Sequence, residues 1–166
     1  MDMKVLLYPD TRLIADNTSI ESYTKDVSDK VVEMFKVMYE TKGIGLAAPQ
    51  IGWNVKLFIM NVTGDSSNKS DERIYYNPTM KTYGELIIDM EGCLSFPQMA
   101  AWIKRYKEIE LEAETPTGHI KETFIDLEAR AIQHEIDHLN GLLFIEKMTP
   151  ADLRRNEPLL RRMRGD

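Results

Sequence analysis

Thiols and imidazoles are scarce in this chain of 166 residues, which contains one cysteine, Cys93, and three histidines. A single thiol excludes a disulfide within the chain and suits a reducing compartment. No apolar run approaches the roughly 18 residues that a membrane-spanning helix needs, and the N-terminus lacks the basic and apolar regions of a secretory signal. We therefore expect a cytoplasmic protein that does not enter a membrane, although an organelle enzyme freed of its transit peptide would show the same features.

Basic residues are also in the minority. The 21 lysines and arginines stand against 27 aspartates and glutamates, which gives a net charge of −6 and a pI of about 5.2. A protein that binds nucleic acid mainly by electrostatic attraction needs a basic surface, so specific DNA binding is disfavoured. The composition, 43% hydrophobic and 29% charged, is typical of a soluble globular protein, and the length suits one domain covering residues 1–166.

Apolar residues at helical spacing predict a first helix over residues 28–42, with Ser28 as its N-cap and Gly43 at its end. Beyond it, strand-forming runs bounded by turn residues predict a series of strands. These cover residues 56–62, 74–77, 85–89, 103–114 and 120–125. The polar stretch 64–72 is expected to be an exposed loop, and the turn at 115–118 makes the last two strands a hairpin.

A strict alternation marks the fourth of these strands. Ile109, Leu111 and Ala113 alternate there with glutamates. A period of two places the apolar side chains on one face of a sheet and the charged ones on the other. The glutamates are therefore expected on the solvent side of an antiparallel sheet; they are Glu108, Glu110, Glu112 and Glu114.

Two more helices are predicted in the C-terminal third. One covers residues 127–139 and ends at the pair Asn140-Gly141, which tolerates a left-handed backbone. The other spans about residues 149–164, with Thr149 as N-cap and Pro158 expected to break or bend it. The order of elements predicts an α+β fold, with antiparallel β-sheets around a central helix and further helices near the two ends.

The central helix carries the most informative pattern, the H-E-x-x-H of His134, Glu135 and His138. Residues four apart lie on one face of a helix, so both imidazoles can bind one metal ion with the carboxylate beside it as a general base. The alternative is an ordinary helix with two exposed histidines. A catalytic site of this type needs a third protein ligand and an open position for water.

Cys93, in the segment Glu91-Gly-Cys-Leu-Ser95, is the strongest candidate for the third ligand because a thiolate binds borderline-soft ions well. The alternative is that this cysteine is simply a small buried apolar residue. The remaining histidine, His119, lies in a Thr-Gly-His turn and is expected at the surface.

The segment Gly43-Ile-Gly-Leu-Ala-Ala-Pro-Gln50 is rich in small residues. It lacks the lysine and hydroxyl residue of a phosphate-binding loop. Small side chains would let a ligand approach the backbone closely, and Gln50 offers an amide donor; a plain turn is the alternative.

These three segments, 43–50, 91–95 and 133–138, together resemble the signature motifs of the peptide deformylase family, in the same order and near the same separations. The opening Leu7-Tyr-Pro-Asp-Thr-Arg-Leu13 is similar as well, so the resemblance covers about residues 4–150. The chain departs from the family pattern at Gln98 and over Met99–Ile103, which are expected at the rim of the substrate site.

The resemblance implies hydrolytic removal of the formyl group from N-formylmethionyl nascent polypeptides. It implies Cys93, His134 and His138 as ligands of one divalent metal ion, Fe(II) in many members, with zinc, nickel or cobalt as substitutes. Glu135 would be the general base and acid. The Gln50 amide and the Leu94 backbone N–H would stabilise the oxyanion.

The same resemblance implies a peptide bound along Gly43, Ile44 and Gly45, with its methionine side chain in a pocket that includes Leu127. We also expect Glu91 to pair with Arg105 and brace the cysteine loop; two ordinary surface charges are the alternative.

Arginines crowd the C-terminal end, where they fit either a solvated helix or a contact with ribosomal RNA. They are Arg154, Arg155, Arg161, Arg162 and Arg164. Two rival functions remain at this stage: a zinc endopeptidase, and a deformylase-like protein that binds peptide or metal without turnover. The extended metzincin motif is missing, because no histidine follows His138.

Overall fold

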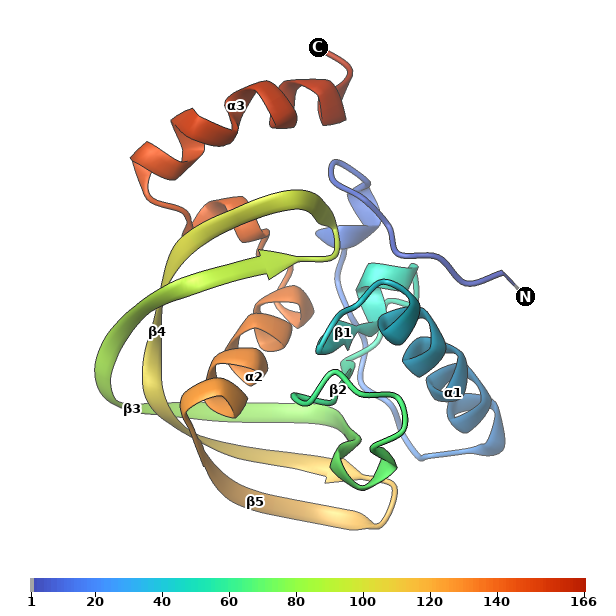
Figure 1. The fold of residues 1–166 in the computed structure, drawn as a ribbon. Coiled ribbons are helices and arrows are strands. Elements are labelled where there is room, and N and C mark those ends of the chain that lie inside the picture. Colours follow the sequence, from blue (N-terminus) through green and yellow to red (C-terminus); the bar gives the residue numbers. More distant parts are fainter. Residues whose placement is uncertain (1) are drawn as a thin grey trace.

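The computed structural model describes residues 2–166, in which three α-helices accompany one five-stranded antiparallel sheet. The helices are α1 (Lys25–Glu40), α2 (Asp126–Leu139) and α3 (Pro150–Arg164). The strands are β1 (Gly45–Ala47), β2 (Leu57–Met60), β3 (Arg73–Cys93), β4 (Phe96–Thr115) and β5 (Gly118–Ile125), and they lie in the order β1-β2-β3-β4-β5. Figure 1 shows α2 in the middle, partly enclosed by a long bent ribbon of β3 and β4. The α+β prediction is confirmed, although the strands form a single sheet.

The strands β3 and β4 are longer than the sequence pattern indicated. The predicted strands 74–77 and 85–89 are parts of β3, which continues without a loop from Arg73 to Cys93. Its pairing with β4 shifts register three times, between Tyr76 and Thr79, between Tyr83 and Leu86, and between Gly92 and Cys93. Such irregularities bend a strand and interrupt its period of two. They hide the continuity of the strand in the sequence and curve the ribbon around α2.

Helix α1 begins earlier than predicted. Thr24 is its N-cap, and its side chain accepts a hydrogen bond from the Val27 N–H, so the prediction of Ser28 as N-cap was wrong. Ser28 lies one turn inside the helix. The helix ends at Glu40, and the left-handed residue that follows is Lys42, with φ of 60°, rather than Gly43. The apolar residues whose helical spacing predicted this helix include Val31, Met34 and Met38, and these three are buried in the core.

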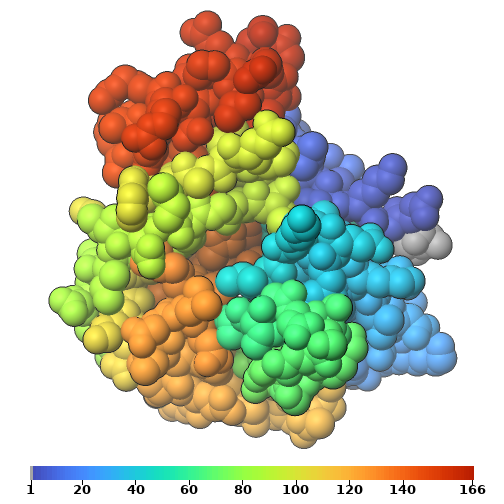
Figure 2. Space-filling view, viewed as in Figure 1, coloured from blue at the N-terminus to red at the C-terminus, as the bar shows by residue number. Residues whose placement is uncertain are grey.

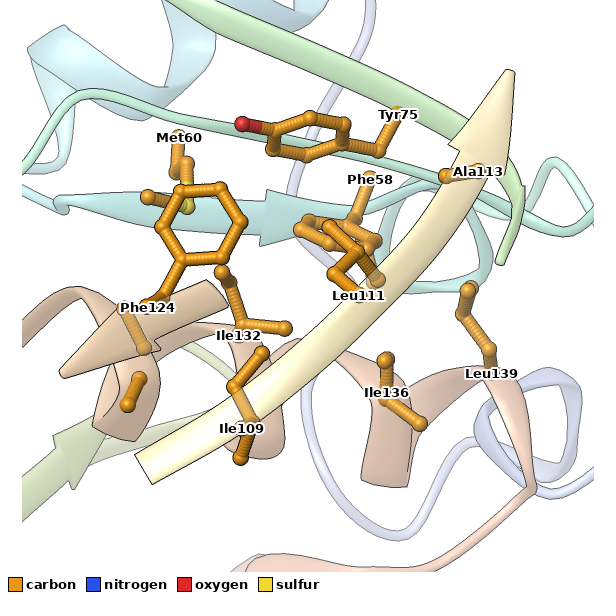
Figure 3. Close-up of a cluster of buried hydrophobic side chains, with 13 residues drawn as sticks. Phe58, Met60, Tyr75, Ile109, Leu111, Ala113, Phe124, Ile132, Ile136 and Leu139 are labelled. Carbon is orange, nitrogen blue, oxygen red and sulfur yellow. The ribbon is translucent and has the colours of Figure 1, made fainter. Parts of the chain in front are cut away.

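The core between α2 and the sheet is drawn in Figure 3. Ile132 and Ile136 of α2 belong to one cluster of buried side chains with Phe58 of β2 and Ile109 and Leu111 of β4. Burial of one side chain of this size contributes about 1.5–3 kcal/mol. The predicted alternation is confirmed, because Ile109, Leu111 and Ala113 are buried and the intervening glutamates are not. The core thus fixes the position of the face of α2 that carries the histidines.

Capping residues mark the end of α2 and the beginning of α3, as predicted. Helix α2 closes before Gly141, which has a left-handed φ of 72°. Helix α3 begins after Thr149, whose hydroxyl accepts a hydrogen bond from Asp152 N–H. Pro158 was predicted to break or bend α3; it does not break the helix, which runs through that residue. Contacts before and after Pro158 hold α3 in place. Before it, Asp152 accepts a hydrogen bond from Trp102 N–H of β4, and after it, Leu160 is buried.

Within residues 2–166, no helix is both long and apolar enough to cross a bilayer.

Candidate functional site

A cleft of about 940 Å³ lies between the segment around β1, the β3–β4 turn and α2. Figure 2 shows the surface hollowed between the yellow-green β3–β4 ribbon and the cyan segment around β1, with α2 visible at the bottom. The cleft is lined by all three segments that the sequence singled out. Among its lining residues are Gly43, Ile44, Gly45, Gln50, Glu91, Cys93, Leu94, Leu127, Arg130, His134 and Glu135.

Three side chains that could hold a metal ion lie close together here: Cys93 and His134, which line the cleft, and His138. Their donor atoms all lie within 4.8 Å of one another. The Nε2 atoms of the two histidines are 3.2 Å apart, and the Cys93 Sγ is 3.4 Å from Nε2 of His138. Bonds of ~2.0–2.3 Å at tetrahedral angles would separate ligand atoms by roughly 3.3–3.6 Å. The donor set therefore fits one small divalent ion, and the four-residue spacing on α2 supplies two of its three ligands.

The backbone explains how Cys93 reaches the histidines. Cys93 is the last residue of β3. Leu94 and Ser95 form the tight turn that leads into β4, and Phe96 at the start of β4 pairs with Cys93. The register shift between Gly92 and Cys93 re-aims the strand at this point. Residues 45 positions apart in the sequence thus meet in a buried contact.

Glu91 holds the first histidine in place. Its Oε1 accepts a hydrogen bond from His134 Nδ1 at 2.9 Å, which makes Nε2 the nitrogen of that ring that can bind a cation. Arg105 donates two hydrogen bonds to the same carboxylate, at 2.9 and 3.0 Å. Glu91 and Arg105 are 7% and 5% exposed, so they are not ordinary surface charges. Burial alone raises the pKa of Glu91, but hydrogen bonds from His134 and Arg105 outweigh it and hold that pKa at about 2.

Two further charged residues belong to this cluster, and they were not identified from the sequence. Arg130 donates to Glu91 Oε2 at 2.6 Å, and Asp137 accepts a hydrogen bond from Arg105 at 2.6 Å. Both residues lie on α2, Arg130 one turn before His134. Only one indication of their role is present in the sequence, which is their spacing from His134 on the same helix. No local pattern shows which strand residues such side chains will contact.

Glu135 is 4% exposed and faces the cleft beside β1. An added methyl group at Gly45 would lie 2.6 Å from Glu135 Oε2, so glycine is what lets this carboxylate approach the strand. Its Oε1 has no hydrogen-bond partner among the described residues. Burial raises the pKa of Glu135 to about 7, and the field of a bound cation would lower it again. A carboxyl group that changes protonation near neutral pH is suited to proton transfer.

Gln50 is fixed by both ends of its amide. Its Oε1 accepts from Ala47 N–H at 3.0 Å, and its Nε2 donates to Ser95 Oγ at 3.1 Å. The same Nε2 lies 3.8 Å from Cys93 Sγ. Gln50 is 2% exposed and is one of the residues that line the cleft, so its amide is held in a fixed position there. Leu94 lines the cleft in the turn after Cys93.

The segment around β1 offers an unpaired edge to the cleft. β1 is the terminal strand of the sheet and pairs only with β2 within residues 2–166, where Gly45 lies opposite Met60. Gly43, Ile44 and Gly45 line the cleft, and Leu127 does so from the first turn of α2. The rim residues Gln98 and Met99 also line it, whereas Trp102 is half-exposed outside it.

His119 lies at the surface, as predicted, and is not among the residues that line the cleft. It is exposed at the start of β5, where its ring contacts Glu112 and Glu114 of β4. The C-terminal arginines are exposed on α3, and several contact neighbouring acids. Arg155 contacts Asp152, while Arg161 and Arg164 contact Glu157.

Comparisons with known proteins agree on one family. Residues 2–154 match the family model described as polypeptide deformylase. A peptide deformylase of Desulfotalea psychrophila is 36% identical over 93% of this chain and 90% of its own length. The chloroplastic peptide deformylase 1B of Solanum lycopersicum is 41% identical over 89% of this chain. The chain spans only about half the length of the plant proteins that it matches, 53% in that case.

Solved structures give the same result. The crystal structure of a plant peptide deformylase superposes with a TM-score of 0.93 at 38% identity, covering 98% of this chain and 89% of that one. A structure of the peptide deformylase from Plasmodium falciparum gives a TM-score of 0.93 at 32% identity, covering 96% and 94%.

Proposed function

The chain belongs to the peptide deformylase family, and on this premise we propose that it hydrolyses the formyl group from N-formylmethionine at the start of newly made polypeptides. Water is consumed, the formyl C–N bond breaks, and the products are formate and a free α-amine. The observation that carries the proposal is the cluster of Cys93, His134 and His138 at a cleft that also contains Glu135.

Cys93, His134 and His138 would hold the metal ion. When bound, a divalent ion supplies Lewis acidity and lowers the pKa of coordinated water towards neutrality. Two imidazoles and a thiolate suit iron, zinc, cobalt and nickel. We propose Fe(II) as the native ion because of the family resemblance, with the other three as substitutes.

Glu135 is proposed as the proton carrier of the reaction. It would accept a proton from the attacking water and deliver it to the nitrogen of the departing amine. Its burial, its raised pKa and its unpartnered Oε1 all support this role. Gly45 supports it as well, because a larger residue there would displace the carboxylate.

Gln50 and Leu94 are proposed to stabilise the charge that develops on the formyl oxygen. The Gln50 Nε2 donor is pre-positioned by two hydrogen bonds, and the Leu94 N–H belongs to the turn beside Cys93. Donors that are fixed before the reaction need no reorganisation as charge develops, and losing one costs about 10²–10³ in kcat.

The peptide is proposed to bind as an added strand on the free edge of β1. Backbone hydrogen bonds to Gly43, Ile44 and Gly45 would hold it extended, and its methionine side chain would contact Leu127. Glu91 and Arg105 would support the site by fixing the cysteine loop and His134.

One assay separates this function from its rivals. The metal-loaded protein is given formyl-Met-Ala-Ser and, separately, a peptide with only internal amide bonds, and formate and cleavage products are quantified. Formate release without internal cleavage is the expected result. Internal cleavage would instead support a zinc endopeptidase, and binding of formyl-Met-Ala-Ser without formate would support a non-catalytic peptide binder.

We also propose that α3 contacts the ribosome, where formylated nascent chains emerge in the cytoplasm or inside an organelle. The exposed arginines of α3 support the idea, since a basic helix binds RNA phosphates. Replacing Arg154 and Arg162 by glutamate, which leaves the buried Leu160 in place, should abolish salt-sensitive cosedimentation with ribosomes. Unchanged cosedimentation would contradict the contact.

A further inference from the structure

Arg130 is a partly buried arginine whose guanidinium joins three structural elements. From α2, its Nη1 donates to Glu91 Oε2 at 2.6 Å and to the Ile103 carbonyl of β4 at 3.0 Å. Its Nη2 donates to the Ile87 carbonyl of β3 at 2.7 Å. The side chain is 11% exposed and lines the cleft. The guanidinium is thus occupied by the protein itself, and its charge is directed at Glu91 rather than at the cleft.

Arg130 and Arg105 together surround the carboxylate that orients a proposed metal ligand. Glu91 uses Oε1 for His134 and one Arg105 nitrogen, and Oε2 for Arg130 and the other Arg105 nitrogen. Asp137 balances the second positive charge through Arg105. Arg105 approaches from β4, the strand paired with that of Glu91, whereas Arg130 approaches from the helix that carries His134.

Because Arg130 lies on the same helix as His134, it can influence the position of the His134 ring relative to β3. The hydrogen bond from Glu91 to this ring crosses from β3 to α2, so any shift between strand and helix would stretch or turn it. Arg130 connects the same two elements directly, by the Ile87 carbonyl and by Glu91 itself. Charge-assisted bonds of this kind are short and strong, and guanidinium geometry restricts the direction of each.

We propose that Arg130 is a positioning residue that acts on His134 through Glu91, fixing the distance between α2 and β3 at the metal site. The inference rests on the proposed metal site, and it assigns to this arginine a share of the metal affinity. It adds no group to the reaction, because the hydrogen bonds of the guanidinium go to Glu91 and to the carbonyls of Ile103 and Ile87. A merely structural arginine would affect the stability of the fold but not the behaviour of a bound ion.

The test uses cobalt(II) as probe, because its visible absorption reports the ligands and geometry around the ion. Affinity is measured by competition with a chelator for the wild-type chain and for Arg130→Met, Arg130→Lys and Arg155→Met. Arg155 is the matched control: it also binds a buried carboxylate, Asp152, at 2.7 Å, but from α3 and outside the cleft lining.

Arg130→Met should weaken cobalt binding about 10–100-fold, as is typical when the partner of a ligand is disturbed, and should change the cobalt spectrum. Arg130→Lys keeps a cation but not the forked geometry, and should fall between. Arg155→Met should match the wild type. If Arg130→Met does not fold, Arg130→Lys decides the question by the same two readouts.

A double-variant cycle tests the route through Glu91. In a Glu91→Gln background the Arg130→Met change should have little further effect on cobalt affinity, because the link is already weakened. Equal effects in both backgrounds, or wild-type affinity and spectrum in both Arg130 variants, would overturn the inference. Failure of the wild type to bind cobalt would overturn it together with the proposed site, whereas cobalt binding without formate release would count against the proposed reaction alone.

Discussion

Single residues at this cleft have separate physical tasks. His134 and His138 share one face of α2 and offer ring nitrogens to a common point, and Glu135 between them faces β1. The task of each follows from its surroundings: Glu91 orients the first imidazole, and burial makes the Glu135 carboxyl a weaker acid. Substitution of one residue at a time should therefore separate metal binding from turnover.

Glu135→Gln should retain the metal and lose turnover. The amide has nearly the shape of the carboxylate but cannot take up a proton from water, and general acid–base catalysis contributes about 10²–10⁴-fold. Metal content and formate release from formyl-Met-Ala-Ser check this together. The control is Glu128→Gln, the same change on the same helix but outside the cleft lining, which should behave as the wild type. Substantial turnover by Glu135→Gln would contradict its assignment.

Gly45→Ala should reduce turnover without removing the metal. The added methyl group would lie 2.6 Å from Glu135 Oε2, a distance that forces the carboxylate aside. Misplacing a reacting group by about 1 Å can cost on the order of 100-fold in rate. Steady-state kinetics and metal analysis of the variant provide the measurement. A wild-type kcat in the Gly45→Ala variant would show that the position of Glu135 is not critical.

At the scale of elements, local hydrogen-bonding rules account for where helices and strands begin and end. Thr24 and Thr149 each cap a helix by accepting a backbone N–H, and register shifts bend the β3–β4 ribbon. The turn that joins β4 to β5, with the residues paired next to it (112–119), and helix α3 lie outside the cleft lining. Their properties can therefore be altered with little effect on the site.

The β4–β5 hairpin should become less stable as the pH rises through the pKa of His119. Hydrogen bonds to Glu114 and Glu112 raise that pKa above 6.5 in the folded state. A raised pKa stabilises the fold below the unfolded value, and this stabilisation disappears as the folded group loses its proton. NMR titration of the ring, with amide exchange of the hairpin, measures both effects.

The double variant Glu112→Gln/Glu114→Gln is the control for this titration. It should bring the pKa of His119 back towards its ordinary value and remove the pH dependence of the hairpin. An unshifted His119 pKa in the wild type would show that the two contacts do not persist in solution.

Pro158→Ala should make α3 more resistant to opening. Within a helix, proline removes one backbone hydrogen bond and crowds the preceding turn, at a cost of up to about 3 kcal/mol. Slower amide exchange over residues 154–164 is the expected result. Pro150→Ala is a matched control, because Pro150 occupies the first turn, where no hydrogen bond is lost. Faster exchange in Pro158→Ala would mean that proline stiffens α3 more than it weakens it.

The whole molecule brings distant segments of the chain to one cleft. Cys93 ends β3 and the two histidines lie on α2, so an ion bound by all three would connect the sheet to the helix. Such an ion would bind the folded state and not the unfolded chain, in which the three ligands are far apart. Its binding free energy would then add to the stability of the fold.

Metal removal should therefore lower the unfolding temperature of the protein. At a free metal concentration of 100 times Kd, the stabilisation is about 2.7 kcal/mol, and a chelator should abolish it. Thermal unfolding with and without chelator gives the measurement. Cys93→Ala should unfold at the same temperature in both conditions if it has lost the ion. A chelator-insensitive wild type would contradict a metal held by these three residues.

The sequence alone determined whatever depends on neighbours within a few residues. Helical spacing located the central helix and put His134 and His138 on one face, and alternation assigned Ile109, Leu111 and Ala113 to the core. Capping chemistry located the start of α3 at Thr149. Three short motifs were enough to indicate the family, because they resemble its signature motifs in residue type, order and separation.

Only the tertiary structure decided what depends on contacts between distant segments. The continuity of β3 was hidden because bulges interrupt its period, and the contact of Arg130 with Glu91 joins residues 39 positions apart. Periodicity reports which face of an element is apolar, but not which element will cover it. The convergence of Cys93 with the histidines arises from long-range packing, since only the folded β3–β4 turn brings its sulfur to the helix.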